Sequence, residues 1–208
     1  MARKKGGSSG RWRERQRRDV YVGQAQRDGW RSRAVFKLQQ INDKERLLRP
    51  GMVCVDLGAA PGGWSQLAAQ IAGESGLVVA VDLLPMETVP GVRFVRGDFT
   101  ERATIDSVCE VLDGRAVDLV MSDMAPNISG NRAIDQPRSL ALAESSLLVA
   151  EDVLKPRGDL LLKAFQGEGI DGFVRDLKGR FGTVKIVKPK ASRAESREIY
   201  LLARNYGM

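Results

Sequence analysis

Short apolar segments alternate with longer amphipathic segments along most of the chain. The apolar segments have the length and residue types of buried strands. They lie at 52–57, 77–83, 92–96, 117–122, 158–165, 183–188 and 198–204. Helices are predicted between them at 62–72, 101–112, 137–154 and 170–180, and an amphipathic helix precedes them at 32–48. Because apolar strands separated by helices are typical of a parallel sheet covered on both faces, we predict an α/β fold.

The last two predicted strands differ from the others in their connection. Only about ten residues separate them, which is too few for a helical crossover, so we expect them to pair as an antiparallel hairpin. A seven-stranded, mostly parallel sheet with a C-terminal hairpin is typical of Rossmann-like methyltransferases that use S-adenosylmethionine (SAM). This is a likeness of fold, and a fold alone does not determine function.

The positive charge of the chain is concentrated near its N-terminus. The 208 residues carry a net charge of +7, and residues 1–33 hold eleven Lys and Arg against three Asp and Glu. We therefore predict a basic, partly disordered arm over residues 1–30 and a single domain over residues 31–208. Because no apolar segment is long enough to be a signal peptide or a membrane span, we expect a cytoplasmic protein without a membrane partner.

Cysteine and histidine usage excludes a zinc site. The chain has two cysteines, Cys54 and Cys109, and no histidine, so the ligands of a tetrahedral site are missing. Proton chemistry near neutral pH would then have to use a lysine, a carboxylate or a cysteine.

The turn after the first predicted strand indicates a ligand site. It reads Asp56-Leu-Gly-Ala-Ala-Pro-Gly-Gly-Trp64 and leads into a helix. Compared with the dinucleotide fingerprint GxGxxG, Gly58 and Gly63 fit, but Ala60 replaces the middle glycine. Pro61 also removes an N–H group near the helix start, where a diphosphate would bind. The turn therefore favours an uncharged or cationic ligand over NAD.

Two aspartates follow the next two predicted strands. Asp82 ends the second strand, where a carboxylate can accept both hydrogen bonds of a ribose diol. Asp98 follows the third strand and could accept a hydrogen bond from an adenine amino group, with Phe99 flanking the ring. A single aspartate after a strand is most often a helix N-cap. The glycine turn and both aspartates in order predict a ligand that contains adenosine.

Four charged residues lie at the ends of apolar segments or on an amphipathic helix. They are Lys37, Asp123, Lys163 and Glu198. Lys163 ends an apolar strand, a position where a charge is expected only if it is paired or used. Taken alone, these residues could equally form salt bridges that tie the first helix and the last hairpin to the sheet.

Four motifs resemble one enzyme family. Besides the glycine turn, they are Ser122-Asp-Met-Ala-Pro126, Leu162-Lys-Ala-Phe165 and Lys188-Pro-Lys-Ala-Ser-Arg193. With these motifs the chain resembles the FtsJ/RrmJ family of RNA ribose 2′-O-methyltransferases over about residues 12–206.

The resemblance implies a cofactor, a substrate and a set of site residues. The cofactor is SAM, and no metal is expected. The implied SAM-binding residues are Gly58, Gly62, Gly63, Trp64, Asp82, Asp98 and Asp123. The implied catalytic residues are Lys37, Asp123, Lys163 and Glu198. The implied substrate is a uridine in the A-loop of 23S ribosomal RNA (rRNA) within the large ribosomal subunit, and the enzyme is expected to be a monomer.

The reaction leaves two roles open for Lys163. Methyl transfer from a sulfonium to a hydroxyl is an in-line displacement, and the hydroxyl must lose its proton as the new bond forms. An ordinary lysine is protonated at neutral pH, and neighbouring lysines and acids would act on it in opposite directions. Lys163 is therefore either a base or a cation that stabilises the developing alkoxide while water takes the proton.

Two basic clusters predict an RNA-binding surface. Trp12, Tyr21 and Trp30 are interleaved with arginines in the N-terminal part, a mixture that suits phosphate contact and base stacking. The second cluster comprises Lys178, Arg180, Lys185, Lys188, Lys190 and Arg193. If this second cluster lies beside the active site, the two clusters would form one surface.

The same residues bear on several other functions. An NAD-dependent oxidoreductase is disfavoured by Ala60 and Pro61. A DNA amino-methyltransferase needs an Asp/Asn-Pro-Pro-aromatic loop for a flipped base, which the segment 123–127 lacks, so DNA is not expected as a partner. A methyltransferase for transfer RNA or messenger RNA caps, and a non-catalytic RNA-binding assembly factor, remain alternatives.

Overall fold

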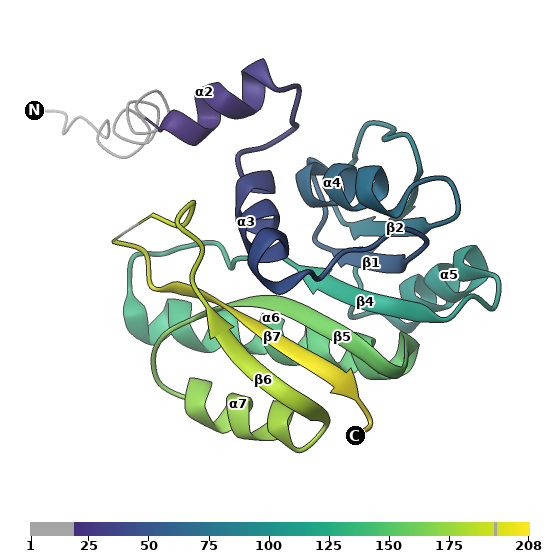
Figure 1. Ribbon diagram of the computed structural model, residues 1–208. Helices are drawn as coiled ribbons and strands as arrows, with labels where there is room; N and C mark the ends of the chain where they lie inside the picture. Colours follow the sequence, from purple (N-terminus) through teal and green to yellow (C-terminus); the bar gives the residue numbers. More distant parts are fainter. Residues whose placement is uncertain (1–18, 194) are drawn as a thin grey trace, which may run out of the picture.

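The computed structural model describes residues 19–193 and 195–208 (Figure 1). The helices are α2 (Val20–Arg27), α3 (Val35–Glu45), α4 (Gly63–Ala72), α5 (Arg102–Leu112), α6 (Arg132–Val153) and α7 (Ile170–Lys178). The strands are β1 (Val53–Leu57), β2 (Leu77–Asp82), β3 (Val92–Arg96), β4 (Val117–Ser122), β5 (Leu154–Phe165), β6 (Phe181–Val187) and β7 (Glu198–Tyr206).

All seven strands belong to one sheet, in the order β3-β2-β1-β4-β5-β7-β6. Strands β1 to β5 pair in parallel, whereas β7 is antiparallel to both β5 and β6. The predicted Rossmann-like α/β fold with an antiparallel C-terminal hairpin is therefore confirmed. The last strand, β7, lies between β5 and β6 and pairs with both, so β6 is joined to the sheet only through β7.

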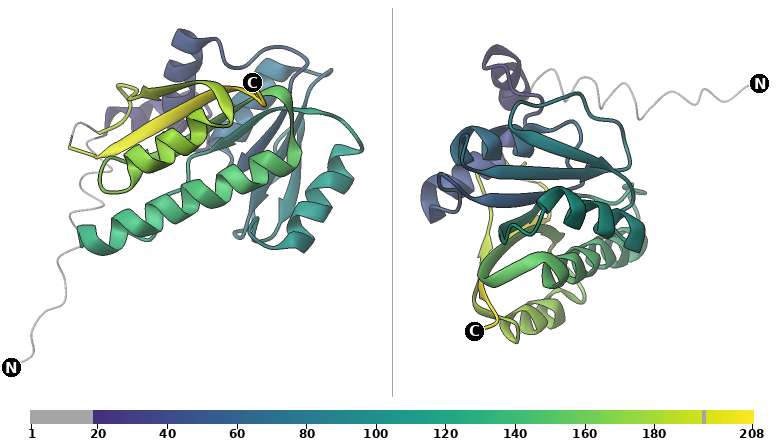
Figure 2. Two further views of the ribbon diagram at one scale, coloured as in Figure 1. Left: turned by 90° about the horizontal axis from the view of Figure 1, so that it is seen from below. Right: turned by 90° about the vertical axis from the view of Figure 1, so that its right-hand side faces the viewer.

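Helices cover both faces of the sheet (Figure 2). Helices α3 and α4 pack with one apolar cluster, and α5, α6 and α7 pack with the other. Side chains of β5 alternate between these clusters, with Leu160 and Leu162 on the α5–α7 face and Leu161 on the α3–α4 face. Since strand residues two apart share a face, Lys163 also points to the α3–α4 face.

Helix α6 begins five residues earlier than the predicted helix 137–154. Its N-cap is Asn131, whose side chain accepts a hydrogen bond from the N–H group of Ala133. Pro137 lies inside the helix. Its missing N–H group leaves only a first-turn carbonyl without an intrahelical donor, so the helix continues through it. The prediction erred by placing the helix start at the proline.

Strand β5 and helix α2 were also predicted incompletely. Strand β5 begins at Leu154 instead of residue 158 and has an irregular register where it pairs with β4. Helix α2 lies within the predicted basic arm and is capped by Asp19. Residues 1–18 of that arm lie outside the described residues, so the division into an arm and a domain stays a prediction.

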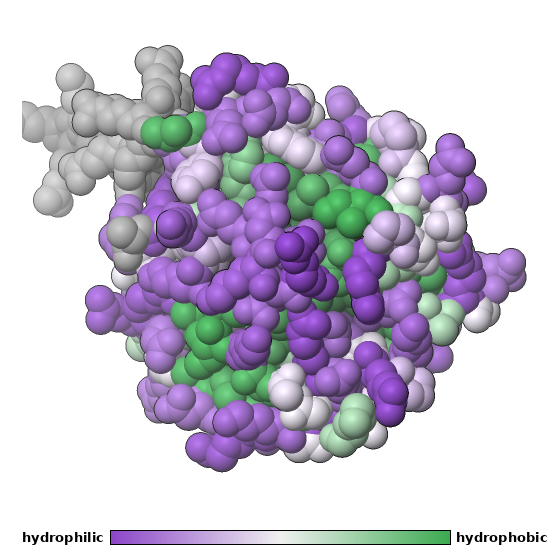
Figure 3. Space-filling view, viewed as in Figure 1, coloured by the Kyte–Doolittle hydropathy of each residue, from purple (hydrophilic) through white to green (hydrophobic). Residues whose placement is uncertain are grey.

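The described surface is mainly hydrophilic. Hydrophobic residues gather in separate patches on the face shown in Figure 3, and large exposed apolar side chains such as Leu148 and Ile186 lie far apart in the sequence. Within the two described segments, none of the helices has the length and hydropathy needed to span a membrane.

Candidate active site

The predicted site residues gather at one end of the sheet. Strands β1 to β5 are parallel and end there, and antiparallel β7 begins there, with Glu198 opposite Phe165 of β5. Glu198 and Tyr200 are two residues apart on β7, and Tyr200 packs in the α3–α4 cluster. Glu198 therefore points to the same face as Lys163. We call this end of the sheet the carboxyl end.

Lys163 is held by Asp123 in two ways. Its Nζ atom donates a hydrogen bond to the backbone carbonyl of Asp123 at 2.6 Å and lies 3.0 Å from Asp123 Oδ1. Only 8% of the Lys163 side chain is exposed. The buried lysine predicted to need a partner is thus paired with the residue that follows β4.

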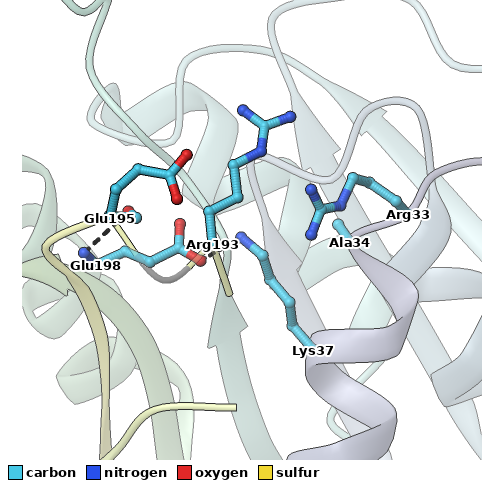
Figure 4. A pocket seen from close by; sticks show the side chains of 7 residues that line it. Arg33, Ala34, Lys37, Arg193, Glu195 and Glu198 are labelled. Atoms are coloured by element: carbon cyan, nitrogen blue, oxygen red, sulfur yellow. Dashed lines mark hydrogen bonds and ion pairs between the residues drawn. The ribbon is translucent and has the colours of Figure 1, made fainter. Parts of the chain in front are cut away.

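Lys37 and Glu198 form the other half of the site. Figure 4 shows Lys37 reaching from α3 toward Glu198 on the opposite side of a pocket. Lys37 Nζ lies 2.8 Å from Glu198 Oε1 and 3.8 Å from Asp123 Oδ1. The pocket has a volume of about 370 Å³, and we call it the target pocket. Its lining residues are Arg33, Ala34, Lys37, Arg193, Glu195, Ser196 and Glu198.

The four charged residues form one network, and its charges affect Glu198. Burial alone would raise the pKa of the Glu198 carboxyl, but the positive charge of Lys37, supported by Ser192 and Lys163, outweighs burial and lowers that pKa. Glu198 is therefore ionised at neutral pH and acts as a fixed acceptor beside the target pocket.

Tyr200 is a site residue that sequence reasoning missed. It is fully buried, and its hydroxyl donates a 2.5 Å hydrogen bond to Asp123 Oδ1. Burial and the charge of Asp123 raise the pKa of this hydroxyl well above its ordinary value, so it remains a donor. The sequence gives no signal for this role, because a tyrosine within an apolar strand is expected to be a core residue.

Trp64 packs behind two residues of the site region, Tyr200 and Ala34. Its buried ring packs against Tyr200 with centroids 5.7 Å apart, and its Nε1–H group donates to the Ala34 carbonyl at 2.9 Å. This bond fixes the start of α3 and so the helix turn that carries Lys37. The indole therefore packs in the core, and the part of Trp64 available to a ligand is its backbone N–H group in the first turn of α4.

Asp82 and Asp98 lie at the ends of β2 and β3, as predicted. The Asp82 carboxylate is oriented by the N–H groups of Ala60 and Leu84, both at 2.8 Å. Asp98 Oδ1 accepts hydrogen bonds from the N–H and hydroxyl groups of Thr100. Each carboxylate keeps lone pairs for a ligand. Phe99 is only 8% exposed and belongs to the core, so little of its ring could flank a base.

Asp56 is a buried acid beneath the glycine turn. It accepts a 2.5 Å hydrogen bond from the Ser65 hydroxyl. Burial, together with the charges of Asp123 and Asp82, raises the pKa of the Asp56 carboxyl to about 7 despite that hydrogen bond. The Asp56 carboxyl is therefore substantially protonated near neutral pH, and the negative charge on this side of the site comes from Asp82 and Asp123, which suits a cationic ligand.

These residues fit SAM. The α4 N-terminus offers N–H groups to a carboxylate, Asp82 offers acceptors to a ribose diol, and the acidic surroundings suit the sulfonium and ammonium charges. Gly58 and Gly62 lie in the turn with positive φ values of 70° and 105°. Gly63 packs closely against Ser32, whose Oγ would lie 2.4 Å from an added Cβ, so this glycine serves helix packing.

Gly58→Ala should disrupt the SAM site. An added Cβ would lie 2.1 Å from Met124 Cγ, next to Asp123, and the positive φ would be strained. We expect a loss of about 1–3 kcal/mol in unfolding free energy and roughly tenfold weaker SAM binding by calorimetry. Gly114→Ala is the matched control, because φ is +73° there and the space around it is open. Equal effects of the two variants on SAM binding would contradict this role of Gly58.

The second basic cluster is divided by the topology. Phe181 pairs with the far end of β7 and Val187 with Tyr200, so β6 starts at the opposite end of the sheet and finishes near the site. Lys178 and Arg180 precede β6, and Arg180 pairs with Glu151. The expectation of one continuous surface is therefore wrong for these two residues.

Three basic residues of that cluster come after β6. Lys188 donates to the Ser196 carbonyl, and Arg193 lines the target pocket. Lys190 lies between them in the sequence and lines a neighbouring pocket beside α3. Lys185, within β6, pairs with Glu45.

The N-terminal aromatic residues also differ from expectation. Tyr21 and Trp30 are partly buried against the α3–α4 cluster, and the ring of Tyr21 lies tilted against that of Phe36, with centroids 5.4 Å apart. Trp12 lies outside the described residues. Asp19 binds both Arg33 and Arg193, so it holds two arginines beside the target pocket.

Comparisons with known proteins identify the family of the chain. The model of the FtsJ-like methyltransferase family matches residues 30–206. The chain belongs to this family. The resemblance found in the sequence and the expected class of enzyme, a methyltransferase, are thereby confirmed. Membership also implies SAM as the methyl donor.

Individual members of the family are similar over nearly the whole chain. "Ribosomal RNA large subunit methyltransferase E" of Alkalilimnicola ehrlichii is 55% identical over 206 residues, covering 99% of both chains. The protein of the same name from Hydrogenovibrio crunogenus is 52% identical over 204 residues, covering 98% of both. A crystal structure of a ribosomal RNA methyltransferase from Plasmodium falciparum has a TM-score of 0.77 and 27% identity, covering 85% of this chain and 98% of its own.

Proposed function

We propose that the protein transfers a methyl group from SAM to the ribose 2′-hydroxyl of a uridine in the A-loop of 23S rRNA within the large ribosomal subunit. The names of its relatives support ribosomal RNA of the large subunit as the substrate. The observation that carries the reaction type is the Lys37–Asp123–Lys163–Glu198 network beside the target pocket.

Among the residues that the structure describes, two contacts to Asp123 leave Lys163 with one free donor. An ammonium group has three N–H donors, and the carbonyl and carboxylate of Asp123 occupy two directions around Nζ. We assign the third N–H to the 2′-oxygen of the target ribose. Its positive charge then stabilises the negative charge that develops on that oxygen. Of the two roles left open by the sequence, this contact pattern favours the cation.

Lys37 and Glu198 position the ribose. Both line the target pocket, and their ion pair fixes the two side chains relative to each other. Glu198, ionised at neutral pH, can accept a hydrogen bond from a ribose hydroxyl. When bound, SAM supplies an electrophilic methyl group and its own leaving group. The 2′-oxygen bonds to the methyl carbon as the carbon–sulfur bond breaks, and the hydroxyl proton passes to water.

Arginine and lysine side chains support an RNA substrate. Arg33 and Arg193 line the target pocket, and Lys188 and Lys190 lie in the segment that leads to it. Contacts of this kind to phosphates raise affinity without reading sequence. They do not distinguish ribosomal RNA from other RNA, so the substrate must be tested directly.

The test is methyl transfer from radiolabelled SAM to large ribosomal subunits from a strain that lacks the enzyme. We expect label in 23S rRNA at one uridine of the A-loop, in a dinucleotide that resists alkali because the 2′-oxygen is blocked. Transfer RNA and capped messenger RNA are run in parallel. Label in a base, or label only in one of these other RNAs, would contradict the proposal. Absence of any transfer would favour a non-catalytic assembly factor.

A further inference from the structure

Two more pockets continue from the target pocket along the carboxyl end of the sheet. The first has a volume of about 340 Å³ and shares Ser196 and Glu198 with the target pocket. The second has a volume of about 530 Å³ and shares Arg197 with the first. We call them the middle pocket and the outer pocket. Because each shares residues with the next, the three form a continuous row that starts at the proposed methylation site.

The row crosses the end of the sheet from one face to the other. Arg197, the residue before β7, lines both the middle and the outer pocket, whereas Glu198 lines the target and the middle pocket. Arg197 is fixed by the loop after β5: its carbonyl accepts from the Gln166 N–H group, and its Nη1 lies 3.5 Å from the Gln166 carbonyl. The outer pocket therefore lies between the start of α6 and the loop that leads into α7.

The walls of the outer pocket are held in place. Gln136 of α6 donates through Nε2 to the carbonyls of Phe165 and Glu168, which fastens both ends of the loop to the helix. Gly169 approaches α6 so closely that an added Cβ would lie 2.7 Å from Leu140 Cδ2. The pocket is thus a formed feature of the fold, with a volume in the usual range for small-ligand sites.

The chemistry of the outer pocket matches a nucleotide. Ala133, Pro137 and Leu140 provide an apolar wall, and Arg132 and Arg197 flank it against one acid, Glu168. Apolar side chains contact the faces of bases, and guanidinium groups bind phosphates bidentately.

An unsatisfied acceptor lies beside this wall. Gln136 is only 7% exposed, and its Oε1 atom has no hydrogen-bond partner among the described residues. Such an acceptor is costly when left unpaired. Because Oε1 is itself buried, the nucleotide would contact the surrounding wall and not this atom.

We infer that the outer pocket binds the nucleotide next to the target nucleotide in the RNA. This inference rests on the proposed function, because it takes the target ribose to lie in the target pocket. The middle pocket, with Ala125, Phe165 and the 60% exposed Ile128, then accommodates the connecting part of the strand. In RNA bound in this way, two successive nucleotides are separated along the end of the sheet. The target ribose lies at the Lys37–Asp123–Lys163–Glu198 network, and the neighbouring nucleotide holds the RNA strand in the outer pocket.

The test combines a variant that fills the outer pocket with RNA that lacks the neighbouring base. Ala133→Trp adds bulk at an exposed first-turn position of α6 that lines the pocket. Ala141→Trp adds the same bulk at an exposed position further along the same helix. The substrates are large subunits reconstituted with ligated 23S rRNA that carries an abasic residue on the 5′ or the 3′ side of the target, or neither.

We expect an abasic residue on one side to lower kcat/KM of the wild type and of Ala141→Trp by roughly tenfold, which corresponds to about 1.4 kcal/mol of lost contact between the base and the apolar wall. Ala133→Trp should be slowed by a similar factor on normal subunits and show no further loss with the abasic substrate. The inference is overturned if the wild type methylates both abasic substrates at the normal rate. It is also overturned if Ala133→Trp keeps the full sensitivity to the missing base, as it would if a protein occupied the pocket.

A second variant tests the outer pocket in case Ala133→Trp does not fold. Arg132→Ala removes charge without adding bulk, and Arg138→Ala is its control on the same helix, at an exposed position outside the pocket lining. Only Arg132→Ala should raise KM and reduce the slope of log affinity against log salt by about one. Equal changes of KM and of the salt slope in the two variants would contradict the binding of RNA in the outer pocket. Failure of the wild type to methylate normal subunits would overturn the proposed function together with this inference, whereas normal methylation without any effect of the base overturns the inference alone.

Discussion

Lys163→Ala should lower the rate of methyl transfer by about 10²–10⁴-fold, the range for loss of a charged group at a reacting oxygen. The variant removes the ammonium that we place at the 2′-oxygen. SAM should still bind, because Lys163 contacts Asp123 and no part of the glycine turn. The rate is measured by single turnover on large subunits and SAM affinity by calorimetry.

Lys155→Ala is a closely matched control. Lys155 lies on the same strand and pairs with Asp118 of β4, as Lys163 pairs with the residue after β4, but it lies at the opposite end of the sheet. It should leave the rate per folded molecule unchanged. Lys163→Arg tests the role of the charge, because arginine stays protonated. A wild-type rate of methyl transfer in Lys163→Ala would show that Lys163 has no part in the reaction. A rate in Lys163→Arg no higher than in Lys163→Ala would contradict the cation role.

Asp123→Asn should lower methyl transfer by about 10²–10³-fold, since it removes the charge that orients Lys163. Asp123 Oδ1 is the shared atom of the site, contacted by Lys163, Lys37 and the Tyr200 hydroxyl. An amide leaves two lysines with only Glu198 as a counter-charge, so we also expect a loss of about 1–3 kcal/mol in unfolding free energy.

A double variant separates these effects. If Asp123 acts through Lys163, then Asp123→Asn combined with Lys163→Ala should be little slower than Lys163→Ala alone. Asp118→Asn is the control for stability, because Asp118 also binds a lysine and accepts from the Val53 N–H group. It should lower stability without lowering the rate of the folded enzyme. Fully additive losses in the double variant would mean that Asp123 and Lys163 act independently.

The sheet was predictable from sequence because most of its strands contain short apolar runs that are bounded by turns. The same pattern could not fix the order of the strands. That β7 lies between β5 and β6 depends on long-range pairing, which periodicity does not encode. The predicted boundaries of helices and strands were wrong where a local signal conflicted with packing. Examples are Pro137, which lies inside α6, and the Pro-Arg-Gly segment, which lies inside β5.

The charged residues of the site were predictable because they interrupt apolar segments. Residues that support them were not. Tyr200 looks like a core residue, and Trp64 is expected from the sequence to bind SAM. Only their buried polar atoms show how they support the charged residues. The cluster from Lys178 to Arg193 looked continuous along the chain, yet β6 carries its members from one end of the sheet to the other.

The position of β7 has a consequence for synthesis on the ribosome. Every other strand of the sheet is made before β7, but β5 and β6 can be joined only through it. A nascent chain that has not yet released β7 exposes two open strand edges and lacks both Glu198 and Tyr200. The candidate active site therefore forms only when β7 has entered the sheet. A chain that stops before residue 198 should be both prone to aggregation and inactive.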